Sequence, residues 1–242
     1  MGGLKNLLSL DLSGTRITGT GLKELRELNN LRYLNLSHTE ITDAGVTNLR
    51  FLSNLSTISF YETRITGDGL GDLSGLDSLT HLNLARTTLT DTGMTKLRGL
   101  GGLTHLNLSR TKITDVGLKN LRGLRNLTNL HLSSIAITET GLKSIRELGN
   151  LRELNLFGTP TTDVGLTHLS ELKELSNLNL GRTQITDAGL GNIRDLRKLT
   201  HLGLHSTKIT HTGLKKLNVY FPGIDVDYSK DNRQSTGVLI TF

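Results

Sequence analysis

The sequence repeats itself every 24 residues, with no insertion or deletion between the first copy and the last. One copy, residues 103–126, has the sequence LTHLNLSRTKITDVGLKNLRGLRN. The copies begin at Leu7, Leu31, Leu55, Leu79, Leu103, Leu127, Leu151, Leu175 and Leu199. A period of this size is typical of solenoid proteins, because so short a unit cannot bury a hydrophobic core by itself and stacks on its neighbours. We therefore predict nine full repeats over residues 7–222.

The first part of each copy has the pattern of a half-buried β-strand. In THLNLS, the period-two alternation places Leu106 and Leu108 on one face. His105 and Asn107 fall on the opposite face. Because all copies run the same way and their connections are short, we expect the strands to stack in parallel at about 4.8 Å per rung.

The second part of each copy has the pattern of a short helix. Leu118, Leu121 and Leu124 recur at a three-residue spacing that suits a helix of two or three turns. Thr114 and Asp115 stand before them and offer side-chain oxygens to the free amides at the start of the helix. One copy is therefore expected to form strand, turn and helix, with the helices on the surface opposite the strands.

One glycine stands at the same place, early in the predicted helix, in every copy. These glycines are Gly21, Gly45, Gly69, Gly93, Gly117, Gly141, Gly165, Gly189 and Gly213. Glycine costs about 1 kcal/mol relative to alanine inside a helix. We therefore expect either a close approach of neighbouring backbones or an unusual dihedral angle at this position.

The pattern LxxLxLxxTxITDxGLxxLxxL resembles the leucine-rich repeat, and most of all the helix-backed type of ribonuclease inhibitor, F-box leucine-rich-repeat proteins and bacterial GALA-like effectors. The resemblance covers about nine tenths of the chain. It implies an α/β, right-handed solenoid with a parallel sheet on the concave face and short helices on the convex face. It also implies a curved scaffold that recognises a protein partner and is not an enzyme. The sequence departs from the pattern in having threonine where many such repeats have asparagine, and in lacking cysteines and an F-box-like segment.

The two ends of the chain depart from the repeat. Residues 1–6 resemble the end of a preceding repeat, and residues 223–228 are expected to form a terminal strand. We therefore predict a single solenoid over residues 1–228, followed by a C-terminal tail, residues 229–242. Because no strand is predicted before residues 7–12, that strand has an open hydrogen-bonding edge. Such edges pair with other chains, so the sequence also predicts self-association through the N-terminal edge.

Partner contacts are expected on the outward strand positions and on the turns that follow them, because these positions are free of the core pattern. Tyrosine, arginine and exposed aromatic side chains contribute more to interface energy than their number suggests. The predicted contact residues are Tyr33, Tyr61, Glu62, His81, Arg86, His105, Arg110, His131, Phe157, Arg182, His201 and His205. The alternative is that the face of a parallel sheet simply requires small polar side chains.

Metal binding and catalysis are sharper alternatives for His81, His105 and His131. Two of these histidines lie on consecutive rungs and the third one rung further in the adjacent column, and three imidazoles can hold zinc or copper. However, the pattern places no carboxylate close enough to orient the rings. A catalytic pair with Ser109 or Ser133 would lack both an orienting group and an oxyanion hole. We therefore predict a solvated histidine ladder, with no metal site, cofactor or enzyme activity.

The charge of the chain supports a second interpretation. The net charge is +6 and the pI is about 9.6, which suits an anionic partner. One column of the convex helices contains Arg26, Arg50, Arg98, Arg122, Arg146 and Arg194. Nucleic acid or another polyanion could follow this stripe. We favour a protein partner, because acidic residues in the next column can pair with the arginines. These are Glu27, Glu147, Glu171 and Asp195.

The composition of the chain excludes cysteine-based sites and predicts no membrane-spanning or leader segment, but it does not indicate a compartment. The chain has no cysteine, which excludes disulfides and zinc–thiolate sites. It has no apolar run of about 18 residues and no basic, then apolar leader, so neither a membrane span nor a signal peptide is predicted. The compartment of the protein does not follow from the sequence.

Overall fold

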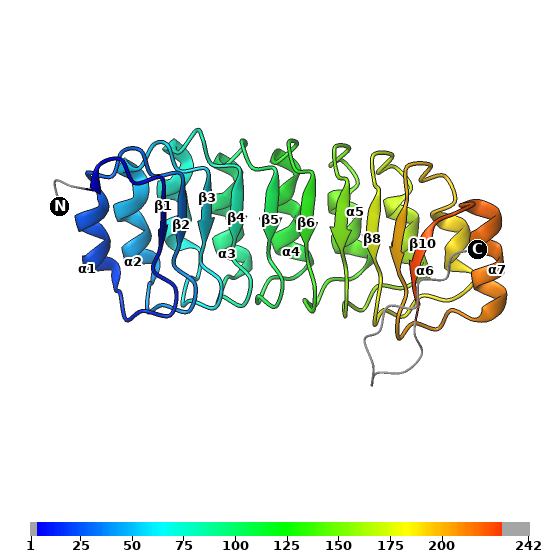
Figure 1. Cartoon of the computed structure of the whole chain (residues 1–242). Coiled ribbons are helices and arrows are strands. Elements are labelled where there is room, and N and C mark those ends of the chain that lie inside the picture. Colours follow the sequence, from blue (N-terminus) through cyan, green and yellow to red (C-terminus); the bar gives the residue numbers. More distant parts are fainter. Residues whose placement is uncertain (1–3, 229–242) are drawn as a thin grey trace.

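The computed structural model describes residues 4–228, which form an arch of stacked rungs. Every rung contributes one strand to a single ten-stranded sheet, whose order follows the chain from β1 to β10 (Figure 1). The strands are β1 (Ser9–Asp11), β2 (Tyr33–Asn35), β3 (Thr57–Ser59), β4 (His81–Asn83), β5 (His105–Asn107), β6 (Asn129–His131), β7 (Glu153–Asn155), β8 (Asn177–Asn179), β9 (His201–Gly203) and β10 (Asp225–Asp227). Neighbouring strands are parallel and pair at an offset of 24 residues, as His81 with His105, so identical positions stack into columns.

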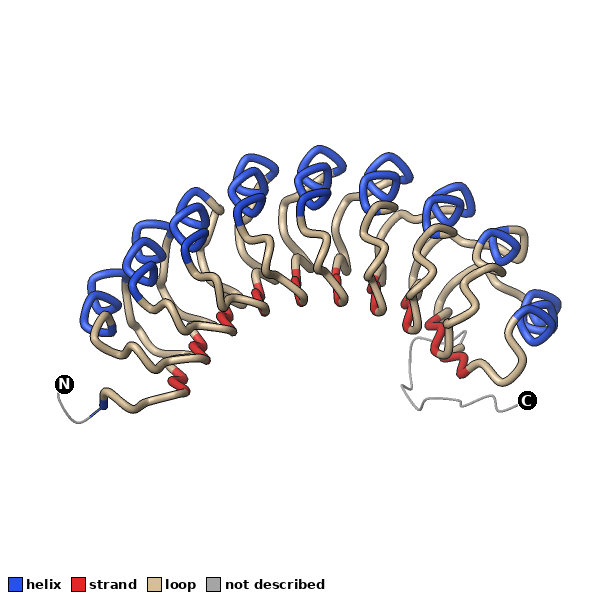
Figure 2. The backbone as a smooth tube through the Cα atoms, turned by 90° about the horizontal axis from the view of Figure 1, so that it is seen from above, coloured by secondary structure: helices blue, strands red, loops and turns tan. Residues whose placement is uncertain are grey.

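Helices cover the other side of the sheet. Figure 2 shows the strands along the inner curve of the arch and the helices along its outer curve. The helices are α1 (Gly19–Leu22), η2 (Lys23–Leu25), α2 (Asp43–Val46), η3 (Thr47–Phe51), η4 (Asp68–Gly75), α3 (Asp91–Met94), η5 (Thr95–Gly99), α4 (Asp115–Leu118), η6 (Lys119–Gly123), α5 (Glu139–Ile145), α6 (Asp163–Leu166), η7 (Thr167–Leu169), η8 (Gly189–Asn192) and α7 (His211–Tyr220). The predicted α/β solenoid is confirmed.

The helices differ in detail from the predicted α-helix of two or three turns. In most repeats one α-helical turn, such as α4, tightens into a 3-10 helix, such as η6. The spacing of the leucines explains this change. Leu118, Leu121 and Leu124 are all fully buried, and a 3-10 helix, with three residues per turn, keeps such a spacing on one face.

The hydrophobic core is one continuous layer between the sheet and the helices. The inward strand residues, such as Leu82 and Leu106, are almost fully buried. Phe60 is the largest fully buried side chain and occupies a position that is leucine in the neighbouring repeats. At the C-terminal end Val226 and Tyr228 are also buried, and the Tyr228 hydroxyl donates to the carbonyl of Ile209 at 3.1 Å.

The two predicted cap residues, Thr114 and Asp115, form hydrogen bonds in different repeats. Thr114 caps its own helix by accepting a hydrogen bond from the Val116 amide at 3.3 Å. The sequence also offered Asp115 as a cap of its own helix, but in the structure Asp115 reaches into the next repeat. Its carboxylate accepts from the Thr138 amide at 2.8 Å and from the Thr138 hydroxyl at 2.6 Å. The aspartate column therefore links consecutive rungs.

The same contacts explain the glycine column. A Cβ added to Gly117 or Gly141 would strike the carboxylate of the aspartate from the preceding rung. Gly93 lies instead against backbone, because a Cβ there would meet the carbonyl oxygen of Thr66 and lie 2.8 Å from Gly67 Cα. No glycine of this column has a positive φ. Close approach, and not an unusual dihedral angle, is therefore the reason for glycine.

Replacing Asp43 with alanine is expected to lower the free energy of unfolding by about 2 kcal/mol, because capping hydrogen bonds are lost. The carboxylate accepts from the amides of Thr66, Gly67 and Gly69 at 2.9–3.1 Å, and from the Thr66 hydroxyl at 2.8 Å. Chemical denaturation at neutral pH measures the change. Asp77→Ala is the matched control, since Asp77 is exposed. A loss for Asp43→Ala no larger than that of the control would contradict this role.

The Asp43 effect is also expected to depend on pH. Burial by itself raises the pKa of this carboxyl group, but its hydrogen bonds outweigh burial and leave the pKa below the usual value. A group with a lowered folded pKa stabilises fully above its ordinary pKa, and this contribution is lost as the pH falls through the folded value. The difference between wild type and Asp43→Ala should therefore shrink below about pH 4. A difference that stays constant as the pH falls well below that value would show that the charge is not involved.

The two ends of the arch concern the predictions of self-association and of a C-terminal tail. Leu4 is 50% exposed and Leu8 is 55% exposed, while Leu7, Leu10 and Leu12 pack partly against the core. Self-association through this edge stays a prediction. The predicted tail, residues 229–242, lies outside the described residues. Within the part of the chain that is described, no helix has both the length and the apolar character needed to cross a membrane.

Candidate recognition surface

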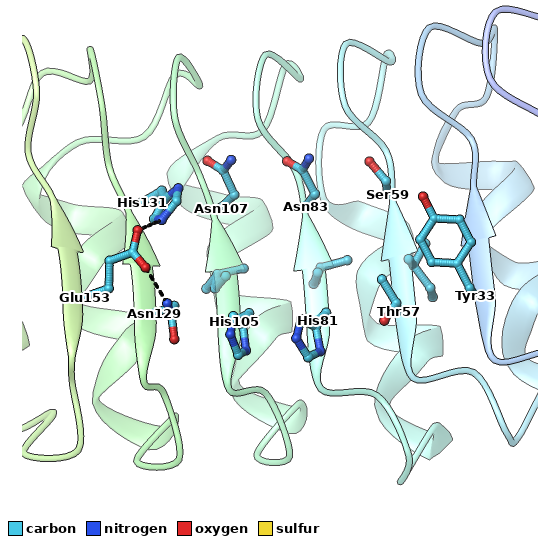
Figure 3. A pocket seen from close by; sticks show the side chains of 13 residues that line it. Tyr33, Thr57, Ser59, His81, Asn83, His105, Asn107, Asn129, His131 and Glu153 are labelled. Atoms are coloured by element: carbon cyan, nitrogen blue, oxygen red, sulfur yellow. Dashed lines mark hydrogen bonds and ion pairs between the residues drawn. The ribbon is translucent and has the colours of Figure 1, made fainter. Parts of the chain in front are cut away.

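The concave face is hollowed over its N-terminal half. A hollow of about 440 Å³ extends across β2 to β7, and Figure 3 shows the side chains that line it. Four predicted contact residues, Tyr33, His81, His105 and His131, lie in this hollow. Glu153 closes its C-terminal side. The side chains come from separate strands, and the parallel register brings them together.

His81 and His105 form a stacked pair at the centre of the hollow. Their ring centroids are 3.9 Å apart and the ring planes differ by 14°. Each Nδ1 lies 2.9 Å from the hydroxyl of the preceding threonine, Thr80 or Thr104. Each hydroxyl also donates to a carbonyl of the preceding rung at 3.2 Å. Because a hydroxyl has one proton, we infer that Nδ1 donates, which leaves Nε2 of each neutral ring as an acceptor.

The position of His105 in the hollow lowers the pKa of its ring. Burial, followed by the proximity of His81, lowers the pKa of His105, and Glu153 opposes this only in part. The physical cause is that a second positive charge beside the first, away from bulk water, is unfavourable. The lowered pKa favours the neutral form of His105, whose ring lies stacked on that of His81 at the centre of the hollow.

Replacing His81 with glutamine is expected to raise the pKa of His105 without restoring its ordinary value. The substitution removes the repulsion from His81, while the burial that contributes most to the shift remains. NMR titration of the imidazole carbon-bound protons measures this pKa directly. His201→Gln is the matched control, because His201 lies on β9, four rungs away from His105. An unchanged His105 pKa in His81→Gln would mean that the two rings do not interact.

Glu153 is the carboxylate that the sequence pattern did not place near the histidines. Its Oε1 lies 2.8 Å from His131 Nε2, and its Oε2 accepts from Asn129 Nδ2 at 2.6 Å (Figure 3). The expectation that no carboxylate approaches the ring is therefore wrong. The contact is diagonal, because Glu153 pairs in register with Asn129 and leans toward the next column. Counting neighbours at offsets two residues either side of the repeat length would have found it.

The geometry of the histidines bears on metal binding and catalysis. Two of the three rings are stacked on each other, and the third is bound to Glu153. Among residues 4–228, no group of three His, Asp or Glu side chains is placed to hold a metal ion. The Ser109 hydroxyl accepts from the Ser133 amide at 3.1 Å, so it belongs to the backbone network of the turns.

The asparagine column of the concave face has a structural role. The Oδ1 atoms of Asn83, Asn107 and Asn155 each accept from the backbone amide two residues later, at 3.0 Å. These bonds close the turn at the end of each strand, as Asx turns do. For these residues the alternative of a structural polar face is the better description.

The turns after the strands contain residues in the left-handed region of backbone space. Nine successive turns have a positive φ at the same position, which is glycine at Gly14 and Gly158. The other seven are His38, Glu62, Arg86, Arg110, Ser134, Arg182 and Ser206. Left-handed geometry costs a residue with a Cβ about 1–2 kcal/mol. Four predicted contact residues, Glu62, Arg86, Arg110 and Arg182, therefore stand at strained positions.

One group of contact residues gathers around Tyr61. The Arg86 guanidinium lies 5.7 Å from the centre of the Tyr61 ring, and its Nη1 lies 3.1 Å from Glu62 Oε2. His38 packs edge-on against Tyr61 with centroids 5.1 Å apart. The structure thus adds His38, which the sequence analysis missed. Its signal was its place in the same column as Glu62 and Arg86.

A second group gathers around Phe157, four rungs further along the arch. The Arg182 guanidinium lies 5.4 Å from the Phe157 ring centre, and His205 packs against the same ring with centroids 5.2 Å apart. His205 Nδ1 lies 3.4 Å from Asp227 Oδ2, within ion-pair range but without hydrogen-bond geometry. The group therefore combines an exposed arginine, an aromatic ring and a histidine beside a carboxylate.

The predicted contact residues thus fall into separate places on the concave side. Tyr33, His81, His105 and His131 line the hollow, and the two turn groups form around Tyr61 and Phe157. Arg110 stands in a turn between these groups. His201 lies at the C-terminal end with its Nε2 3.6 Å from Asp225 Oδ2. Asp225 and Asp227, like Glu153, were not among the predicted contacts.

The convex arginine stripe is exposed along its length. Pairing with the adjacent acidic column occurs at two places, Arg26 with Glu27 at 3.5 Å and Arg194 with Asp195 at 3.9 Å. Arg50 lies instead over the ring of Phe51, 4.8 Å from its centre. Such exposed pairs contribute little to stability, about 0–1 kcal/mol each.

Known proteins resemble the chain in sequence and in fold. A family model described as "Leucine rich repeat" matches residues 30–89, 78–137 and 101–161, and a second model with the same description matches residues 3–25. No curated protein matches the sequence.

Two solved bacterial structures show the same fold. Internalin C2 from Listeria monocytogenes is 24% identical with a TM-score of 0.66, over 94% of this chain and 83% of its own. A leucine-rich-repeat protein from Leptospira interrogans is 21% identical with a TM-score of 0.58, over 92% of this chain and 72% of its own.

Proposed function

This chain belongs to the leucine-rich-repeat family, and from that premise we propose that it is a protein-recognition scaffold. The leucine-rich-repeat fold is a common protein-interaction scaffold and is typically non-enzymatic. The proposed contact surface is the concave face together with the turns that follow its strands. The hollow over β2 to β7 is the observation that carries the proposal.

The shape and chemistry of the hollow favour a protein partner. A hollow of about 440 Å³ that is open along the arch suits an inserted side chain or loop. Its wall includes Tyr33, which is 38% exposed, and the planar pair of His81 and His105. Aromatic side chains that stay exposed on a rigid sheet bury large areas at little entropic cost when a partner binds.

The turn residues support the same surface. The Arg86 and Arg182 guanidinium groups lie over the rings of Tyr61 and Phe157. Arginine and tyrosine are enriched among the residues that dominate interface energies. Because Tyr61 and Phe157 lie four rungs apart, about 19 Å, the surface suits a folded partner more than a single small ligand.

Affinity capture with matched variants tests this function. The full chain is used as bait in an extract of its source, beside a variant with Tyr33→Ala, Tyr61→Ala and His105→Ala. The control variant carries Lys96→Ala, Arg98→Ala and Lys119→Ala on exposed convex positions. Wild type and control should retain the same protein in near-stoichiometric amount, and the concave variant should lose it.

The opposite pattern would reject the proposal. If the concave variant retained every protein that wild type retains, the concave face would not be the contact surface. Circular dichroism checks that both variants keep the fold. We expect that they do, because all the substituted side chains lie outside the buried core.

A further inference from the structure

The charge excess of the protein is concentrated in the turns after the strands. Eight of the nine turns contain a threonine at the same place, Thr15 in the first repeat, and the sixth has Ile135 there. The two positions beside this residue, 18 over the nine repeats, hold seven Lys or Arg residues and two Glu. We call the seven the basic rim, which consists of Arg16, Arg64, Arg86, Arg110, Lys112, Arg182 and Lys208. The flanking positions therefore account for +5 of the net charge of +6, although they are a small part of the chain. The rest of the chain, which includes the convex arginine stripe, has nearly equal numbers of acidic and basic residues.

The backbone fixes the basic rim along one edge of the sheet. The Arg86 amide donates to the Ser109 carbonyl and the Arg110 amide to the Ser133 carbonyl, both at 2.9 Å. This ladder sets adjacent rim residues one rung apart, about 4.8 Å. In Figure 3 these turns follow the arrowheads of the strands, at the edge of the hollow.

The charges of the rim are mostly uncompensated. Arg86 pairs with Glu62. Within residues 4–228, Arg64, Arg110 and Lys112 form no ion pair, and all three are exposed. Like charges spaced one rung apart repel one another, so an arrangement of this kind is unfavourable in the free protein. An anionic partner would remove that cost.

Three rim residues share the left-handed backbone of the turns. Arg86, Arg110 and Arg182 have φ of 54–57°, and Ser134 and Ser206 have the same conformation without a charge. The strain therefore belongs to the turn of every repeat, whereas the positive charge is particular to the rim. Gly14 and Gly158 occupy the same position, so glycine is compatible with it.

The neighbouring charges favour a polypeptide over a nucleic acid. Glu153, Asp225 and Asp227 lie on the adjoining concave face, where a uniformly negative phosphate backbone would meet repulsion. Arg86 and Arg182 already stand over the rings of Tyr61 and Phe157, so they compete with bases for these stacking surfaces. A polypeptide can direct acidic side chains to the rim and neutral or basic ones to the carboxylates.

We propose that the basic rim binds an acidic polypeptide segment of the partner, with Arg86, Arg110 and Lys112 as its central contacts. This inference rests on the proposed scaffold function and specifies the chemistry of the partner. Association is steered by charge, so it weakens as salt screens the rim.

Fluorescence polarisation with defined probes tests the inference. The probes are a fluorescein-labelled polyglutamate peptide and an oligothymidylate of the same length and charge. The rim variant is R86E/R110E/K112E, and Glu62 shows that glutamate is accepted at the left-handed position. The control R98E/R122E/R146E changes the charge equally on the exposed convex stripe. A third variant, R86G/R110G, removes two charges and relaxes the backbone at both positions.

The expected result is selective loss at the rim. Polyglutamate should bind wild type at low salt, and the rim variant should weaken binding by about tenfold or more, against about twofold or less for the control. R86G/R110G should also weaken binding without lowering the thermal midpoint of unfolding. Oligothymidylate should bind wild type less tightly than polyglutamate.

Other outcomes would overturn the inference. Absence of polyglutamate binding at low salt, or equal loss in the rim and convex variants, would show that the rim is not a specific site. Tighter binding of oligothymidylate, lost in the rim variant, would identify a nucleic-acid surface instead. If the rim variant retained the partner captured by wild type while the concave variant lost it, the scaffold function would stand and the acidic partner would be wrong.

Discussion

Replacing Phe60 with alanine is expected to lower the free energy of unfolding by about 4 kcal/mol, the largest effect among the substitutions considered. Phe60 is fully buried and is the largest such side chain in the core. Its removal leaves a cavity between two rungs that rigid neighbours cannot fill. Chemical denaturation followed by circular dichroism measures the change.

Phe60→Leu is the matched control, because the corresponding residues in the neighbouring repeats, Leu36 and Leu84, are leucines that are also fully buried. This variant should lose about 1 kcal/mol, since the rung then resembles its neighbours and little volume is lost. Similar losses for alanine and leucine would indicate that the core collapses around the site. Each repeat contacts only its neighbours. We therefore expect the N-terminal repeats of Phe60→Ala to unfold in a separate transition, before the rest of the solenoid.

Replacing Gly93 with alanine is expected to destabilise the protein by about 3 kcal/mol, although alanine is the better helix former. The added Cβ would strike the Thr66 carbonyl oxygen and lie 2.8 Å from Gly67 Cα and 2.9 Å from Leu89 Cδ1. Two of these three contacts are backbone, which cannot move without separating the rungs. The same denaturation experiment measures the loss.

Gly101→Ala is the control for Gly93. A Cβ at Gly101 would meet no atom within 4 Å, and the residue does not have a positive φ. This substitution should change the free energy of unfolding by less than about 0.5 kcal/mol. A neutral Gly93→Ala would show that the rungs can separate at little cost, and that close approach does not explain the glycine.

The sequence by itself determined the rung and its register. An unbroken period places Leu82 above Leu106 and His81 beside His105 before any coordinates are considered, and the structure confirms these pairs. The period was sufficient because every repeat packs the same residue types against its neighbours, so the arrangement of one repeat applies to all. The buried leucines and the outward strand positions followed directly from the period-two alternation.

Only the tertiary structure decided which polar groups meet across the rungs. Either Thr114 or Asp115 was expected to cap the helix of its own repeat. Thr114 does so, whereas the pitch of the stack brings Thr138 of the next repeat within reach of Asp115. Glu153 leans diagonally to His131, at a distance that depends on side-chain rotamers and on the curvature of the sheet. A linear pattern specifies the column of each residue, whereas these contacts join different columns of successive rungs.

The charge of the surface shows the same division. The sequence alone gave a net charge of +6 and a visible stripe of arginines on the helices. The period already placed Arg86 and Arg110 one rung apart, but their left-handed backbone conformation became apparent only in three dimensions. The reason is physical: a backbone dihedral angle at a non-glycine residue arises from the packing of neighbouring repeats, and the residue types of a single repeat do not specify it.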